Sequence, residues 1–379
     1  MQGRDDFRVT LLQVLECITG DAPLVTQNGE IIIREILPSL AAIYNGNKDG
    51  DARFLCLKIW FDSLTILLTE CTEIEQQISE DLKSISNSHF LPLYPALIQD
   101  EDPIPAYAQK LLVMLVEFDY IKISNLLRHN TVSQCFEFLL GDLSSANVNN
   151  VKLCLALASA PEMESKLLSQ LKVVRRIGNL LEFVNAKDME DFLEPTLSLC
   201  RAFLLRSLGN KKGLSSNYTK EPTLLSEASF TFEVDPQECI RDIADFGSNI
   251  GLFLHFAGLD DDTSIAVADI ASECVVLLLK AASREATTGF LTNLPKITPI
   301  LDSWRRRKST ELHLLVLKRV LHCLGYACKQ YLSQAMILSI SGHDVSKINA
   351  IVSEMKNSDA AGLNSIASLV AMELQRLPR

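Results

Sequence analysis

Apolar residues recur along most of this chain at spacings of three and four, which is the pattern of helices that bury one face. The clearest unit is residues 88–120, where a proline-containing apolar stretch is followed by an acidic turn and a second apolar stretch. Pro103 and Pro105 suit the entry of the second helix, because the first turn of a helix leaves N–H groups without intrahelical partners. The unit therefore predicts two antiparallel helices joined by a tight turn at Asp100.

Similar helix pairs are expected elsewhere, with starts roughly 40 to 58 residues apart, which brackets the period of HEAT and armadillo repeats. The expected pairs are 30–44 with 52–70, 130–140 with 149–159, and 170–184 with 189–208, while residues 7–18 suit half of an earlier pair. Each pair has an apolar face too wide to bury within itself, so neighbouring pairs must stack. The pattern predicts an all-α, HEAT/armadillo-like α-solenoid of stacked antiparallel helix pairs.

One segment interrupts the helical pattern and suggests the domain organisation. Residues 209–234 are polar, contain two glycines and a proline, and lack periodicity, so we expect a flexible surface loop there. It separates an N-terminal repeat block, residues 1–208, from a C-terminal block, residues 235–379, that continues the solenoid. Helices of the second block are expected at 240–257, 264–282, 290–303, 310–340 and within 344–377. No stretch predicts a sheet.

Composition narrows the class of protein further. Hydrophobic residues make up 47% of the chain, which is enough to bury a core and argues against disorder. The net charge of −11 argues against general nucleic-acid binding, which needs a basic surface. The densest apolar run, residues 274–282, contains Lys280 and is too short for a membrane span, so it predicts a buried core helix. We expect neither nucleic acid nor membrane as a partner.

The cysteines and the N-terminus bear on localisation. Ten cysteines are scattered singly through apolar helical patterns, which favours a reducing cytoplasm. Acidic residues follow Met1 where a secretory signal would carry basic ones, so no signal peptide is expected there. Met1 is also compatible with the start of a fragment or of a gene model. The sequon at Asn217 has meaning only in a secreted chain, and we expect it to be unused.

Two short motifs imitate known sites. Asp245, Phe246 and Gly247 spell the magnesium-binding triplet of protein kinases, but the phosphate loop, the strand lysine and the catalytic loop are missing from the sequence. Residues 45–50 imitate the first half of an EF-hand loop, yet the position of its bidentate glutamate is Cys56. We interpret the first motif as part of an amphipathic helix and the second as a turn between helices.

His313, His322, Cys323 and Cys328 fall on one expected helix, but their spacing does not suit zinc ligands, so we interpret them mainly as core residues. The sequence also lacks a catalytic triad pattern or a nucleotide-binding loop, so no catalytic, metal or cofactor residue is assigned.

The strongest charged feature is a run of basic residues, and it forms the first part of the candidate partner-binding site. The candidate basic residues are Arg305, Arg306, Arg307 and Lys308 in an expected inter-helix turn, with Lys318 and Arg319 one helix later. One interpretation is a solvated turn whose charges favour a helix dipole. The other is a docking patch for an acidic protein surface such as tubulin. Lys172, Arg175 and Arg176 form a smaller cluster of the same kind.

The amino-acid sequence of one segment resembles that of a known family. DEDPIPAYAQKLLVMLVEFDY, residues 100–120, together with the preceding FLPLYPALIQ, is similar to the helical-repeat region of plant RUNKEL and its animal relatives, the Fused-type members of the Unc-51-like serine/threonine kinases. Full-length relatives carry a kinase or pseudokinase domain before a long HEAT/armadillo array. The resemblance implies that this chain is a C-terminal part of such an array, and no catalytic residue carries over to it.

The same resemblance implies a scaffold associated with microtubules and, in plants, with the phragmoplast at cytokinesis. Three hypotheses follow. The chain is a non-enzymatic interaction module of microtubule-linked cell division, or an adaptor that binds proteins without touching the filament, or part of a kinase whose catalytic domain lies elsewhere. The expected location is the cytoplasm, at the cytoskeleton or phragmoplast.

Overall fold

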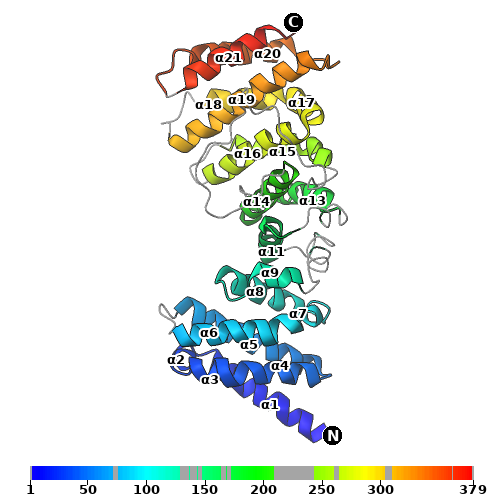
Figure 1. Cartoon of the computed structure of the whole chain (residues 1–379), viewed down its shortest axis with the longest axis vertical. Helices are drawn as coiled ribbons and strands as arrows, with labels where there is room; N and C mark the ends of the chain where they lie inside the picture. Colours follow the sequence, from blue (N-terminus) through cyan, green and yellow to red (C-terminus); the bar gives the residue numbers. More distant parts are fainter. Residues whose placement is uncertain are drawn as a thin grey trace. The chain divides into compact units, whose positions relative to one another are not determined.

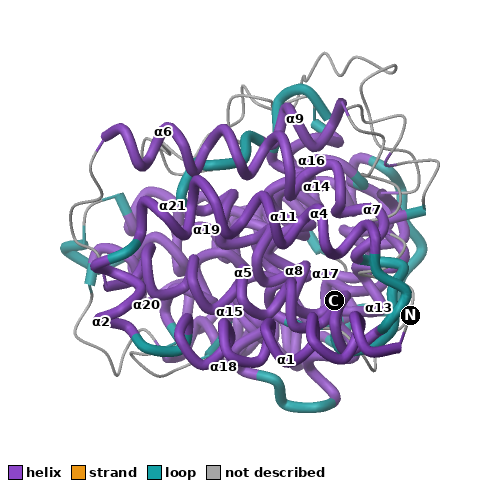
Figure 2. Tube along the Cα trace, turned by 90° about the horizontal axis from the view of Figure 1, so that it is seen from below, coloured by secondary structure: helices purple, strands orange, loops and turns teal. Residues whose placement is uncertain are grey.

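Helices joined by loops and turns make up the residues that the computed structural model describes (Figure 2). The described residues are 2–70, 76–128, 136, 143, 147–163, 168, 172–208, 243–259, 264–303, 310–360 and 362–377. Within these ranges there is no strand, which confirms the predicted all-α class. None of the described helices is long and apolar enough to cross a membrane.

The chain divides into two compact units, residues 1–157 and residues 158–379 (Figure 1). The first unit contains α1 (Gln2–Thr19), α2 (Ala22–Gln27), α3 (Gly29–Ile31), the π turn η1 (Ile32–Ile36), α4 (Leu37–Gly46), α5 (Gly50–Glu70), α6 (Gln76–Ile85), the π turn η2 (Ser86–Phe90), α7 (Leu91–Leu97), α8 (Ile104–Glu117), α9 (Ile123–Arg128) and most of α11 (Val148–Ser159).

The second unit opens with the last residues of α11 and holds the remaining helices. They are α13 (Val173–Ala186), α14 (Glu190–Ser207), the 3-10 helix η6 (Ile243–Asn249), α15 (Ile250–Ala257), α16 (Ile265–Ala281), α17 (Ser283–Thr292), α18 (Leu294–Ser303), α19 (Glu311–Ser333), α20 (Gly342–Met355) and α21 (Leu363–Gln375).

The first unit is built around α5, which packs against α1, α2, α4 and α8. Its buried side chains include Ile59, Trp60 and Leu64, and the Trp60 indole donates to the Leu37 carbonyl of the facing helix at 2.9 Å. The expected pair 30–44 with 52–70 and the expected pair within residues 88–120 are therefore confirmed as helix pairs. Residues 7–18 belong to α1, as predicted.

Two prolines in this unit each follow a π turn. Pro38 and Pro92 are at the start of α4 and α7, directly after η1 and η2. A proline inside a helix lacks an N–H and clashes with the carbonyl four residues earlier, and a wider π turn relieves that conflict. In both places the residue before the proline donates to the carbonyl five residues back, from Leu37 to Ile32 and from Leu91 to Ser86.

A polar cluster joins the two helix pairs at their turns. Arg53 at the start of α5 donates to both carboxylate oxygens of Asp100, at 2.8 Å and 2.7 Å. The Tyr44 hydroxyl at the end of α4 donates to the same carboxylate at 2.6 Å. Hydrogen bonds from Arg53 lower the pKa of Asp100 to about 2, and burial raises the pKa of Tyr44. The acidic turn in the sequence is thus a contact between neighbouring pairs.

The second unit contains a row of stacked helices in which α14 packs on α16, α16 on α19 and α19 on α21. The buried core of α16 includes Cys274 to Leu279, which confirms the predicted core helix at 274–282. Helix α14 precedes the expected loop 209–234 and α16 follows it, so the stack continues across that part of the sequence within this unit. Residues 209–234 themselves lie outside the described residues, and the loop stays a prediction.

Three expected boundaries differ from the structure. The segment around Phe246 begins as a 3-10 helix, η6, where an α-helix was expected, and a side chain at Gly247 would come within 3.1 Å of Glu285 Cβ. The helix expected at 310–340 ends at Ser333, because Ala335 has a positive φ of 47°. The tail forms two helices, with Gly362 in the left-handed conformation before α21. Periodicity alone does not locate such breaks.

Candidate partner-binding site

The six candidate basic residues differ in whether the structure describes them and in how exposed they are. Arg305, Arg306, Arg307 and Lys308 belong to residues 304–309, which lie outside the described residues. Both flanking residues are described: Ser303 ends α18, and Thr310 caps α19 by accepting a hydrogen bond from the His313 amide at 3.2 Å. The basic run thus falls between α18 and α19 in the sequence, and its place in an inter-helix turn stays a prediction.

Arg319 is excluded from an exposed patch. Its residue is 3% exposed, and its guanidinium donates to the Asp269 carbonyl at 2.9 Å, to the Asp269 carboxylate, and to the Ser272 hydroxyl at 3.1 Å. These bonds connect α19 to α16. The prediction that Arg319 belongs to a surface patch was wrong, because α19 is covered by neighbouring helices over most of its circumference.

Lys318 is half-buried on the same helix, and its ammonium group lies beside Gly362 at the start of α21. The smaller basic cluster lies on α13, where Lys172 and Arg175 are exposed and Arg176 is half-buried. Ser303, the last described residue before the basic run, lines a cavity.

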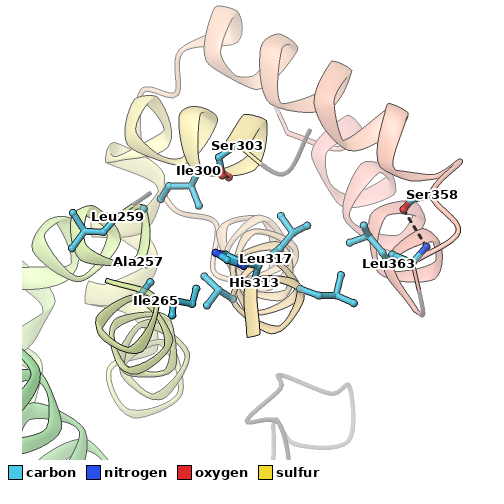
Figure 3. Close-up of a pocket in the computed structure, with 14 residues that line it drawn as sticks. Ala257, Leu259, Ile265, Ile300, Ser303, His313, Leu317, Ser358 and Leu363 are labelled. Atoms are coloured by element: carbon cyan, nitrogen blue, oxygen red, sulfur yellow. Dashed lines mark hydrogen bonds between the residues drawn. The ribbon is translucent and has the colours of Figure 1, made fainter. Parts of the chain in front are cut away.

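The cavity lies between the ends of five helices of the second unit (Figure 3). Its empty volume, counted out to the open solvent, is about 670 Å³. It is lined by Ala257, Gly258 and Leu259 after α15, Ile265 and Ala268 of α16, Ile300 and Ser303 of α18, His313, Leu314, Val316 and Leu317 of α19, and Ser358, Ala360 and Leu363 next to α21. We call it the α18–α19 pocket.

The pocket has an apolar floor and a partly polar rim. Of its lining residues, Ala268 and Leu363 are buried, while the polar residues Ser303, His313 and Ser358 are half-buried. Ser358 accepts a hydrogen bond from the Ala360 amide at 3.3 Å, the dashed line in Figure 3, and so holds the loop before α21. Such a lining suits an apolar side chain whose backbone or neighbours remain in water.

Close packing at one position gives the pocket its shape. A side chain at Gly258 would place a Cβ 2.8 Å from Cγ1 of Ile300, so only glycine allows the end of α15 to approach α18 this closely. Periodicity did not reveal the pocket, because its walls come from residues more than a hundred positions apart in the sequence. The one local feature of the sequence that could have indicated the pocket is Gly258, which directly follows an apolar helix.

The other motif residues have structural positions. Cys323 and Cys328 are fully buried in α19, as predicted for core residues, and burial raises the pKa of Cys328 to about 12. In the part of the chain that the structure describes, no cluster of three or more metal-binding side chains occurs. Phe246 is buried in the core.

Within the EF-hand imitation at 45–50, residues 47–49 form the turn between α4 and α5 as predicted, and the flanking residues belong to the two helices. The Asn47 side chain accepts from the Asp49 amide, and the Asp49 side chain accepts from the Asp51 amide, each at 3.1 Å. Cys56 is buried in α5. These side chains therefore order the turn by capping backbone amides.

Comparisons with known proteins agree with the helical repeats. The model described as "Serine/threonine-protein kinase ULK4-like, HEAT repeats" matches residues 1–124. Among curated proteins, the mouse (Mus musculus) "Serine/threonine-protein kinase ULK4" is 20% identical over 334 residues, covering 83% of this chain and 25% of that protein. The chain thus spans about a quarter of the length of this relative.

One similar solved structure comes from work titled "A conserved phosphorylation switch controls the interaction between cadherin and beta-catenin in vitro and in vivo". It is 13% identical, with a TM-score of 0.50, and the match covers 98% of this chain and 75% of that one. This likeness shows the fold alone, an α-solenoid. The model described as "RUNKEL ARM-repeat domain" matches residues 130–379, which is more than half of the chain. The chain therefore belongs to the RUNKEL ARM-repeat family, and its N-terminal part is related to the HEAT repeats of ULK4-like proteins.

Proposed function

We propose that this chain is a non-catalytic protein-interaction scaffold that binds an acidic protein segment at the α18–α19 pocket and the basic run beside it. The observation that carries the proposal is that Ser303, at the rim of the pocket, directly precedes Trp304 and the four basic residues 305–308 in the sequence. An apolar side chain would enter the pocket, and acidic neighbours would meet the basic run. The repeat families that match the chain support protein binding as its role.

The charge balance around the pocket limits this site. Residues 260–262 are three aspartates that directly follow Leu259, another lining residue of the pocket, in the sequence. A uniformly acidic partner would be attracted by the basic run and repelled by these aspartates, so we expect the fitting segment to have its acidic residues on one side of its apolar anchor. The site would therefore select partners by the order of acidic and apolar residues in their sequence. A segment bound in the reverse orientation would bring its acidic residues near the three aspartates, and like charges across an interface repel.

The finer proposal is that the partner surface belongs to microtubules, and that the chain serves cytokinesis in the cytoplasm, at the phragmoplast in a plant cell. Its support is the family relationship together with the basic run, since the tubulin surface is acidic. The net charge of −11 opposes a general attraction to an acidic filament, so the contact must be local. Imaging of the fluorescently tagged chain in dividing cells tests the location, and a signal excluded from microtubule arrays would contradict it.

Co-sedimentation with stabilised microtubules tests the contact itself. The variant R305E/R306E/R307E/K308E is expected to reduce the pelleted fraction several-fold at low salt, and added salt should weaken the wild-type contact in the same way. The matched control is K172E/R175E, which reverses exposed charges on α13 and should pellet like the wild type. Filling the pocket mouth with A360W separates the two halves of the site, because it leaves every charge in place.

Unchanged pelleting of the charge-reversed variant would overturn the microtubule assignment. A second candidate, an adaptor that binds other proteins without filament contact, is then favoured if A360W and the charge reversal both abolish the same partner interaction in pull-downs.

A third candidate follows from the name and length of the mouse relative, a serine/threonine-protein kinase of which this chain spans about a quarter. On that proposal the chain is the repeat region of a longer kinase-type protein. Mg-ATP should not raise the melting temperature of residues 1–379, and a clear upward shift would contradict the non-catalytic role.

A further inference from the structure

A threonine, Thr310, follows the basic run and Ser309, and it is the first residue after them that the structure describes. Arg305 and Arg307 lie five and three residues before it, in the longest run of basic residues in the chain. Many serine/threonine kinases have an acidic substrate groove and select an acceptor by arginines at such positions, since opposite charges hold the segment in register. Thr310 therefore has the charge pattern of a kinase acceptor, in a chain whose net charge of −11 otherwise repels such a groove.

The fold leaves the Thr310 side chain accessible to an enzyme. The residue is exposed and is the N-cap of α19, with φ −75° and ψ 159°, so its own backbone is extended rather than helical. Its hydroxyl oxygen accepts from the His313 amide at 3.2 Å and lies 2.5 Å from Nδ1 of the same residue. Ser303, the last hydroxyl residue before the basic run, is half-buried. An enzyme can therefore reach the Thr310 hydroxyl from solvent, at a helix end where intrahelical hydrogen bonds are fewest.

We propose that Thr310 is a phosphorylation site for a serine/threonine kinase of this arginine-selecting class, and that its phosphate weakens the binding of an acidic segment at the α18–α19 pocket. In the reaction, the Thr310 oxygen forms a bond to the γ-phosphorus of ATP as the bond from that phosphorus to the β,γ-bridging oxygen breaks. The hydroxyl proton goes to the catalytic base of the kinase, and ADP leaves. The effect on the pocket rests on the proposed function, whereas the modification itself does not.

The phosphate changes the charge of the site and leaves α19 folded. It adds about −1.5 to −2 charges at neutral pH, close after four positive ones in the sequence, so an acidic partner is attracted less strongly. The N-terminus of a helix favours negative charge, so a phosphate on the N-cap stabilises α19 rather than breaking it. His313, whose ring contacts the Thr310 hydroxyl, also lines the pocket. The added charge therefore lies next to the pocket as well as next to the basic run.

Incubation of the folded chain with ATP and protein kinase B, which selects arginines five and three residues before its acceptor, tests the modification. Tandem mass spectrometry is expected to locate the phosphate on Thr310. T310S should be phosphorylated, and T310N should not, although asparagine caps a helix at least as well as threonine. R305A/R307A should lower the initial rate by about tenfold or more. The matched control is K172A/R175A, which removes two exposed charges on α13 and should be phosphorylated like the wild type.

Three results would overturn the modification site. They are an absence of phosphate from Thr310, phosphate on Ser309 alone, and an equal loss of rate in the α13 control. Circular dichroism of the phosphorylated chain checks the fold, because a phosphate on the N-cap should not lower the melting temperature. A clear drop in that temperature would contradict the expected position of the phosphate at the start of α19.

Fluorescence anisotropy tests the effect on the pocket, with a labelled peptide that has a leucine followed by a run of glutamates. T310D and T310N both cap α19 and differ by one charge, so T310D is expected to raise the Kd of the peptide about two- to fivefold at low salt. Equal binding of the two variants, with the wild type bound, would overturn the regulation. A peptide that the wild type does not bind would instead overturn the proposed acidic-segment site, while mass spectrometry still decides the modification.

Discussion

The two units stack the same kind of helix but place their charged contacts differently. In the first unit, Arg53 and Asp100 meet at the turns, where their side chains are 17% and 9% exposed. In the second unit, Arg206 and Arg319 are only 2% and 3% exposed, between helices. Water can replace part of a broken contact at an edge, whereas it cannot reach a buried one. Charged contacts therefore stabilise the helix stack at its edge in the first unit and in its core in the second.

The largest effect is expected at Arg206. Its guanidinium donates to the carbonyls of Ala158, Ala160 and Met163, the last at 2.8 Å, and so ties α14 to the end of α11 and the residues after it. Replacing Arg206 by methionine leaves these buried carbonyls without their donor, and each unsatisfied group costs about 1–3 kcal/mol before relaxation. We expect R206M to lower the free energy of unfolding of the second unit by about 3–5 kcal/mol.

Urea unfolding followed by circular dichroism, together with hydrogen exchange in residues 158–208, measures this loss. R206K should lie between the wild type and R206M, because an ammonium group cannot reach three carbonyls in the planar arrangement of a guanidinium. The control is K187M, an exposed position after α13 that should change little. A cost of R206M below about 1 kcal/mol would contradict the idea that the core contact carries the stability of this unit.

A smaller and pH-dependent effect is expected at Asp100. The Arg53 hydrogen bonds hold the pKa of Asp100 at about 2, below its ordinary value of 3.8. Because the folded pKa is the lower one, the carboxylate stabilises the fold above about pH 4, and this contribution is lost as the pH falls from about 4 to about 2. At neutral pH we expect D100N to cost about 1–2 kcal/mol.

Thermal unfolding of the wild type and of D100N over a range of pH measures this contribution as a difference, since other carboxylates titrate in both proteins. The difference in melting temperature should shrink as the pH approaches 2. Y44F, which removes the hydrogen bond from a hydroxyl to the same charged carboxylate, should cost about 1.5 kcal/mol. A difference that does not change with pH would mean that the charge of Asp100 does not stabilise the contact.

The sequence predicts those parts of the fold that depend on the spacing of apolar residues, and it does not predict those that depend on contacts between distant residues. The helical spacing of apolar residues located the helices at 30–44, 52–70 and 189–208, because these residues pack against neighbouring helices. It also identified the acidic turn at Asp100. The partners of that turn, Arg53 and Tyr44, lie about fifty residues earlier, and nothing local to the sequence joins them to it.

Arg319 shows why the charged residues were harder to place. In the sequence it follows Lys318 and looks like part of a basic surface. In the fold, α19 is enclosed by α16, α17 and α21, so even an arginine is buried once Asp269 and Ser272 are in reach. The α18–α19 pocket depends in the same way on which helices become neighbours, and spacing along the chain does not determine that.

The smallest loss of stability is expected at an exposed ion pair of the first unit. Among these charged contacts, this pair is the most exposed, as Arg206 is the most buried. Lys152 lies 3.4 Å from Glu117, and the two side chains are 45% and 53% exposed. Exposed pairs of this kind contribute about 0–0.5 kcal/mol, because water and salt replace the partner. K152A should therefore leave the urea midpoint almost unchanged, and additional salt should not alter the result. A loss above about 1 kcal/mol would show that contacts open to water also fasten the stack, and burial would then not explain the difference between Arg206 and Asp100.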